Sequence, residues 1–352
     1  MAEIKNLCKG FLKLIFNKII KRRFPLNVFI AVTNQCNLKC HYCYGEYYCR
    51  DNAREFTTDE LINILIDIKR MGGVFVQFQG GEPLMRKDID IIVKKAKELK
   101  LNTDLLTNGL LVQSKVEVVK MVDSVCLSLD GRKKINDKNR GANTFEIILQ
   151  AIDICKSIKK PLRFNCVLTN ETEPEDIDFL MSLCKEQNIL ANFCPAFEFK
   201  PLSDNKKFEY FEYDKEKYYK LLDLIIDYKN KDYPIQFSAD AYKISKNWKL
   251  PLYKKRATLN EFFDYRKYGL PKCYHGDYVC FIDSDGRMYP CCNFWNDYDD
   301  INVHKLGFEK AFEKLHRAGC EACYIYSYID RNRLLNLNFK TLINYLKIRK
   351  FD

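Results

Sequence analysis

Three cysteines, Cys36, Cys40 and Cys43, lie in one short loop directly after an apolar run of the chain. Thiolates bind soft metals, and four of them supply a ligand to every iron of a cubic iron–sulfur cluster. Three thiolates from one loop would leave one iron without a protein ligand and open to a small molecule. The same residues also allow a zinc knuckle, a redox pair or buried structural thiols.

A second segment whose residues could bind a ligand follows the next apolar run. It is Gln79-Gly80-Gly81-Glu82-Pro83-Leu84. Two glycines let a backbone approach a ligand closely, and backbone carbonyls or the Glu82 carboxylate can accept hydrogen bonds from an ammonium group. By itself such a segment is a turn in most proteins. One βα unit after the three cysteines, it predicts a ligand site.

Polar residues also mark the ends of later apolar runs. Thr107-Asn108-Gly109 closes the third run, Ser128-Leu129-Asp130-Gly131 closes the fourth, and Arg140-Gly141 follows in the next loop. Asn165 is a polar residue inside the fifth run. In a βα barrel, residues at the C-terminal ends of strands form the site, so these segments are expected to converge.

Together, the cysteine triplet and the segments at residues 80–83 and 128–131 resemble the signature of the radical S-adenosylmethionine (SAM) superfamily. The resemblance implies that the open iron of a [4Fe-4S] cluster chelates SAM, and that an electron from the cluster cleaves it to a 5′-deoxyadenosyl radical. It also implies that Tyr42 lies beside the adenine and that Asp130 reaches the ribose or the substrate. The SAM-binding residues implied in this way are Tyr42, Gly80, Gly81, Glu82, Ser128, Asp130, Arg140 and Asn165. For Arg140 and Asn165, a loop-structural and a core-polar role stay open.

A second group of cysteines lies near the C-terminus: Cys273, Cys280, Cys291, Cys292, Cys320 and Cys323. This group resembles the twitch domain, a shortened SPASM domain that binds one auxiliary [4Fe-4S] cluster. We assign that cluster to Cys273, Cys291, Cys320 and Cys323. Cys280 and Cys292 are left as spares, with Cys292 as the alternative to Cys291. A structural zinc with the same four thiolates is the alternative.

The elements that must position these residues follow from the alternation of β-rich and helical patterns between residues 27 and 230, which indicates βα units and a parallel sheet. The predicted strands are 27–33, 74–79, 102–107, 124–129, 162–168 and 190–196. The predicted helices are 88–100, 113–121, 143–159, 175–187 and 215–229, with another that opens at the capping box Thr57–Glu60. The fold class is therefore α/β, a partial (β/α)6 TIM-like barrel.

We divide the chain accordingly. Residues 1–26 form a basic amphipathic helix, 27–232 the radical SAM core, 233–272 a connecting segment, 273–330 a small twitch/SPASM-like domain, and 331–352 a second basic amphipathic helix. Within the small domain, 278–289 reads as a hairpin with its turn at Asp283-Ser284-Asp285-Gly286.

Composition indicates a globular protein in a reducing compartment. The chain has 352 residues, of which 47% are hydrophobic and 30% charged, enough for a sizeable core. Its sixteen cysteines cluster in two places and no signal peptide precedes them, so metal ligation in the cytoplasm fits better than disulfides. No apolar run approaches the roughly 18 residues that a membrane span needs.

The net charge of +11 belongs to the two ends. Residues 1–23 carry seven Lys or Arg against one acid, and residues 331–352 carry six against one, so the middle is neutral. Basic amphipathic helices can lie on an anionic membrane surface, or they can pack onto the enzyme. Nucleic-acid binding is not expected, because the neutral middle offers no basic stripe.

The resemblance to these enzymes implies a radical SAM oxidoreductase or maturase that uses SAM and two [4Fe-4S] clusters. We expect net oxidation of a small or carrier-bound molecule, sugar-like or lipid-linked. The alternative is a maturase of a ribosomally made peptide, although only 26 residues precede the first strand and a leader-binding domain needs more. A non-catalytic iron–sulfur or zinc protein is the alternative from another class. The expected partner is a reductant such as flavodoxin or ferredoxin. No catalytic acid or base can be chosen from the sequence.

Overall fold

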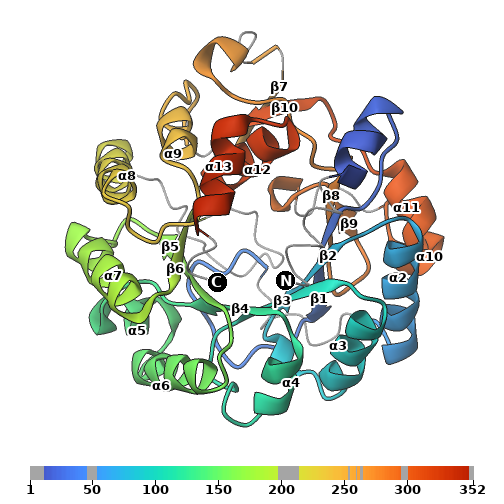
Figure 1. The fold of residues 1–352 in the computed structure, drawn as a ribbon, viewed down its shortest axis with the longest axis horizontal. Helices are drawn as coiled ribbons and strands as arrows, with labels where there is room; N and C mark the ends of the chain where they lie inside the picture. The colour runs from blue at the N-terminus through green and yellow to red at the C-terminus, as the bar shows by residue number, and fades with distance from the viewer. Residues whose placement is uncertain are drawn as a thin grey trace, which may run out of the picture.

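The computed structural model describes residues 12–45, 54–196, 214–252, 254–258, 260–261, 265–294 and 300–348. In Figure 1 the strands occupy the centre and the helices surround them, with the C-terminal helices in front of the open side. The first part of the predicted N-terminal helix, which includes Ile4, Leu7, Cys8 and Phe11, lies outside the described residues.

Six parallel strands form the barrel wall in chain order, as predicted. They are β1 (Asn27–Thr33), β2 (Phe75–Gly80), β3 (Asn102–Thr107), β4 (Ser124–Ser128), β5 (Leu162–Leu168) and β6 (Leu190–Pro195). Each pairs in parallel with the next. The partial barrel expected from the sequence is therefore confirmed.

Helices cover the outer face of this sheet (Figure 1). They are α2 (Thr58–Arg70), α3 (Ile89–Glu98), α4 (Val116–Met121), α5 (Lys133–Arg140), α6 (Thr144–Ser157), α7 (Pro174–Gln187) and α8 (Lys215–Asn230), with a 3₁₀ turn at Pro83–Met85. The predicted capping box is present: Thr57 accepts from the Glu60 N–H, and the Glu60 carboxylate accepts from the Thr57 N–H. The sequence pattern did not indicate α5.

The C-terminal part continues the same sheet. β8 (Val279–Ile282) pairs in parallel with β1, and β9 (Met288–Tyr289) pairs antiparallel with β8 as the predicted hairpin. Separately, β7 (Arg256–Thr258) pairs antiparallel with β10 (Cys320–Cys323). The remaining elements are α9 (Ala239–Ser245), α10 (Val303–Leu306), α11 (Phe308–Lys314), α12 (Tyr326–Leu335), α13 (Phe339–Ile348), and 3₁₀ turns at Tyr265–Tyr268 and Cys292–Phe294.

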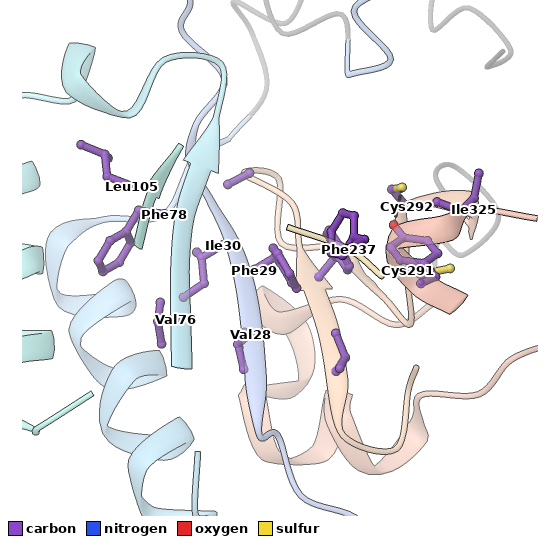
Figure 2. Close-up of a cluster of buried hydrophobic side chains, with 14 of the residues drawn as sticks. Val28, Phe29, Ile30, Val76, Phe78, Leu105, Phe237, Cys291, Cys292 and Ile325 are labelled. Carbon is purple, nitrogen blue, oxygen red and sulfur yellow. Dashed lines mark hydrogen bonds between the residues drawn. The ribbon is translucent and has the colours of Figure 1, made fainter. Parts of the chain in front are cut away.

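One apolar core joins the barrel to the cysteine-rich part. Figure 2 shows Phe29 of β1 pointing toward Phe237, Cys291 and Cys292, whereas Phe78 lies on the other side of the strand. The Phe29 ring also stacks on Phe281 of β8 with 4.3 Å between centroids. The two cysteine groups therefore belong to one packed body.

Residues 12–19 are helical. Leu14 of this helix is only 3% exposed and packs against the rest of the protein. Lys18 reaches the Leu335 carbonyl at the end of α12. Across the part of the chain that the structure describes, no helix is both long enough and apolar enough to cross a bilayer.

Candidate functional site

The cysteine loop lies against the end of β2. The N–H of Gly81 donates to the Thr33 carbonyl over 2.9 Å, and the N–H of Glu82 donates to the Gln35 carbonyl over 2.8 Å. A Cβ at Gly81 would stand 2.1 Å from the Gln35 oxygen, and one at Gly80 would stand 2.4 Å from the Thr33 oxygen. The space that these glycines leave is thus filled by the backbone that leads into the cysteine loop.

Two further contacts fix the middle of the loop. Asn108, which follows β3, donates from Nδ2 to Oδ1 of Asn37 over 2.7 Å. The N–H of His41 donates to the Asn139 carbonyl of α5 over 3.3 Å. The cysteine loop is therefore hydrogen-bonded to the turn after β2, to the residue that follows β3 and to α5. These contacts hold the backbone between the cysteines in one conformation.

Asp130, at the end of β4, gathers four donors and is 0% exposed. Its Oδ2 accepts from the Tyr42 hydroxyl over 2.6 Å and from Asn139 over 3.2 Å, and its Oδ1 accepts from Arg140 over 2.8 Å and the Val167 N–H over 3.0 Å. The Arg140 side chain is 5% exposed. Three predicted SAM-binding residues, Tyr42, Asp130 and Arg140, therefore contact one another.

The Glu82 carboxylate is also fully buried. It accepts hydrogen bonds from the Thr107 hydroxyl over 2.7 Å, from the Asn108 N–H over 2.8 Å and from the Leu84 N–H over 3.0 Å. Burial raises the pKa of Glu82 to about 7, and these donors oppose the rise. The side chain ties the turn after β2 to the end of β3.

The three thiols of the loop are half-buried, and none of them forms a disulfide. Burial raises the pKa of Cys36 to about 12, and the charges of Cys40 and Cys43 add to that rise, so the three sulfurs lie within electrostatic reach of one another. Burial likewise raises the pKa of Cys40 to about 11, against the opposing Arg140 charge. A metal centre would displace these protons, and the three soft donors fit an iron–sulfur cluster.

The last two predicted SAM contacts lie side by side on the wall. Ser128 of β4 is in register with Asn165 of β5. Oδ1 of Asn165 accepts from Nδ2 of Asn192 over 2.9 Å and lies 3.7 Å from the Cys194 sulfur. Six of the predicted residues thus contact the cysteine loop or one another, whereas Ser128 and Asn165 pair with each other on adjacent strands.

The second cysteine group meets at one cavity. Cys273, Cys291, Cys320 and Cys323 all line one pocket that is partly open to solvent. Burial raises the pKa of Cys291 far above its usual value, and the charges of the neighbouring Cys292 and of the other three lining thiols add to the rise. Among the described residues, no three His, Cys, Asp or Glu side chains are arranged to hold a single metal ion. Four thiols that line one space are the donor set that a [4Fe-4S] cluster uses.

The two spare cysteines do not line this cavity. Cys280 is 0% exposed on β8, in register with Val28 of β1. The Cys292 sulfur lies 2.6 Å from the Tyr328 hydroxyl. Figure 2 shows the sulfurs of Cys291 and Cys292 on different sides of the chain.

Several residues around the two centres had not been singled out from the sequence. Oε1 of Glu55 accepts from the Thr33 hydroxyl and from the Asn34 N–H, over 2.9 and 2.6 Å, at the start of the loop. Asn332 donates to the Cys273 sulfur over 3.7 Å. No motif marks these positions, because each one is defined by a contact across 21 to 59 residues of sequence.

Comparisons with known proteins agree with this geometry. The family model described as the radical SAM superfamily matches residues 30–184. An Fe-coproporphyrin III synthase from Methanosarcina barkeri is 33% identical over 166 residues, which cover 45% of this chain and 40% of that protein. A pre-heme d1 synthase from Dinoroseobacter shibae is 35% identical over 178 residues, 48% of this chain and 43% of that protein. The matched region thus spans less than half of these relatives.

Two solved structures are similar over most of the chain. SuiB from Streptococcus suis bound to S-adenosylmethionine has a TM-score of 0.62 at 23% identity, covering 85% of this chain and 66% of that one. The enzyme anSMEcpe with bound AdoMet and a peptide also has a TM-score of 0.62, at 19% identity, covering 91% of this chain and 99% of that one. At these identities the likeness concerns the fold.

Proposed function

We propose that Cys36, Cys40 and Cys43 hold a [4Fe-4S] cluster, because residues 30–184 match the radical SAM superfamily, whose members use SAM and such a cluster. When bound, the cluster and SAM supply a 5′-deoxyadenosyl radical that abstracts hydrogen from a substrate. The other residues of the site bind, orient and exclude water. The observation that carries this proposal is the fastening of the three-thiol loop to the Gly81–Glu82 backbone.

The residues near the loop divide into two roles. Tyr42, Asp130 and Arg140 position the third cysteine, because their polar atoms already contact one another. Ser128 and Asn165 face the same side of the wall and are the groups that would meet SAM. At the turn after β2, the backbone carbonyls of Gly80 and Gly81 would accept from the SAM ammonium, since the Glu82 oxygens are engaged.

We assign the auxiliary [4Fe-4S] cluster to Cys273, Cys291, Cys320 and Cys323, because these thiols line one cavity. A cluster with all four irons ligated supplies a one-electron acceptor rather than a binding position for a small molecule. Such an acceptor makes net oxidation of the substrate the function that the two centres support best. A structural zinc at the same four thiols is the alternative for this site.

Polar side chains on the sheet support a small polar substrate, sugar-like or lipid-linked. Asp104 of β3 contacts Gln77 of β2, Ser124 of β4 and Arg163 of β5, and Asn165 contacts Asn192 of β6. Since residues two apart on a strand share a face, Arg163 and Asn165 point to the same side. The amides and the ion pair of this layer can donate and accept hydrogen bonds with the hydroxyl groups of a substrate. The alternative is modification of a ribosomally made peptide, a reading favoured by the peptide present in the anSMEcpe structure.

The N-terminal helix supports a peripheral contact with an anionic membrane. Leu12, Phe16 and Ile19 are 65%, 61% and 73% exposed, and together with Ile20 they form one stripe at helical spacing. Lysines and arginines flank the stripe in the sequence. A cytoplasmic enzyme that meets a lipid-linked substrate at the inner surface, with a flavodoxin or ferredoxin as reductant, is consistent with this arrangement.

Anaerobic reconstitution with iron and sulfide, followed by dithionite and SAM, tests the enzymatic proposal. We expect 5′-deoxyadenosine from the wild-type chain and none from a variant with Cys36, Cys40 and Cys43 changed to Ala. That variant should retain about four irons at the auxiliary site. A cluster-loaded wild type that forms no 5′-deoxyadenosine would favour the non-catalytic carrier, and zinc in place of iron in the variant would reject the auxiliary cluster.

A further inference from the structure

The thiol of Cys273 accepts a hydrogen bond from a buried side-chain amide. Nδ2 of Asn332 on α12 donates to its sulfur over 3.7 Å. Arg317 donates to the backbone carbonyl of the same cysteine. Asn332 and Arg317 both line the four-thiol cavity, so two donors from separate parts of the chain meet at its Cys273 corner.

The direction of the Asn332 amide is fixed by a second contact. Its Oδ1 accepts from the N–H of Tyr274 over 2.8 Å, and the residue is only 3% exposed. A backbone N–H can only donate, so the atom that faces Tyr274 must be the oxygen and the amide nitrogen must face Cys273. The donor is thus held in place without rotational freedom.

Arg317 is held in a similar way. Its guanidinium donates to the carbonyl of Cys273 and lies 3.5 Å from a carboxylate oxygen of Asp277. Because a guanidinium keeps its charge at all physiological pH values, this group supplies a permanent positive charge beside the sulfur.

We propose that Asn332, supported by Arg317, raises the reduction potential of the auxiliary cluster by donating hydrogen bonds to the Cys273 thiolate. The inference rests on the auxiliary cluster of the proposed function. Reduction adds negative charge to a cluster and its thiolates, so N–H donors stabilise the reduced form more than the oxidised form. Asn332 is a positioning residue that acts through Cys273 and favours electron acceptance at this centre.

The test uses the full chain with Cys36, Cys40 and Cys43 changed to Ala, so that only the auxiliary cluster remains. Its midpoint potential is measured by an EPR-monitored redox titration, with and without Asn332→Leu. We expect the Leu variant to shift the one-electron equilibrium about tenfold toward the oxidised form, a fall of about 59 mV. The matched control is Asn336→Leu, at the residue that caps the C-terminus of α12, because Asn336 donates to the Lys272 and Asn332 carbonyls and not to a cysteine sulfur.

An unchanged potential in a fully loaded Asn332→Leu variant, or an equal fall in Asn336→Leu, would overturn the proposal. Asn332→Asp keeps the acceptor for Tyr274 but loses the donor, so its potential should also fall. If both Asn332 variants fold but bind no iron, Asn332 is needed for cluster assembly rather than for the reduction potential, and this result also contradicts the proposal. If the chain with only Cys36, Cys40 and Cys43 changed to Ala holds no iron, the auxiliary cluster itself is wrong. Failure of the proposed cluster is therefore distinguishable from failure of the Asn332 proposal.

Discussion

The hydroxyl of Tyr42 donates to Oδ2 of Asp130 over 2.6 Å, and both residues are buried. Tyr42 directly precedes the third cysteine of the loop, whereas Asp130 follows the last residue of β4 by two positions and lies 88 residues further along the chain. The contact explains how the position of Cys43 depends on the barrel wall. The same carboxylate binds Arg140, so the loop, the wall and α5 share one buried polar cluster.

Asp130→Asn should therefore destabilise the protein and loosen the loop. The change leaves the buried Arg140 guanidinium without its charge partner, which typically costs about 3–5 kcal/mol. Urea unfolding measures the free energy of unfolding, and iron content after reconstitution measures whether the cysteine loop still binds its cluster. Glu117→Gln removes an exposed ion pair with Lys120 and should change stability by no more than about 1 kcal/mol. Equal losses in the two variants would contradict the structural role of Asp130.

Gly81→Ala should selectively impair the first cluster. The added Cβ would stand 2.1 Å from the Gln35 oxygen, so the backbone that leads into the cysteine loop must move. We expect iron content to fall by about half after reconstitution, because the four-thiol cavity is built from other elements and serves as an internal control. Wild-type iron content together with undiminished 5′-deoxyadenosine formation would show that the close packing is not required.

Cys291 and Cys292 should differ in their effect on the auxiliary cluster, although they are neighbours. Cys291 lines the cavity, and the Cys292 sulfur contacts Tyr328. In the background without the first cluster, Cys291→Ser should abolish iron binding, whereas Cys292→Ser and Cys280→Ala should keep about four irons. Iron analysis and EPR spectroscopy distinguish these variants. The reverse pattern for Cys291 and Cys292 would exchange the two assignments.

Asp330 should make stability depend on pH. Burial raises its pKa from the usual 3.8 to about 6, against the opposing hydrogen bonds from Ser238. The folded state thus holds a proton that the unfolded state has lost, so stability falls as pH rises from about 4 to about 6, by up to about 3 kcal/mol. Asp330→Asn should lack this decrease when urea unfolding is compared across the range. Parallel curves for the two proteins would refute the assignment.

The exposed stripe on the N-terminal helix should bind anionic vesicles. Changing Leu12, Phe16 and Ile19 to Ser removes apolar surface that would enter the headgroup region, so partitioning in a sedimentation assay should fall more than tenfold. Ile66→Ser together with Ile91→Ser is the control, because these exposed residues lie on α2 and α3. Binding should also weaken as salt increases. Equal binding by the stripe variant and the wild type would remove the helix from the proposed membrane contact.

The sequence by itself determined the barrel and the order of its motifs. Buried strands such as Asn27–Thr33 and amphipathic helices such as Thr58–Arg70 carry periodic patterns that local sequence displays directly. The three cysteines of the loop are likewise close in the chain, so their chemistry could be inferred from spacing alone.

Only the tertiary structure decided which distant groups meet. β8 pairs with β1, and four thiols from separate elements meet at one cavity. Asn332 donates to Cys273, which lies 59 residues earlier in the chain. Such contacts depend on how whole elements pack, and packing leaves no local pattern in the chain. Asp130 illustrates the difference: its position at a strand end was readable, but its four buried donors were not.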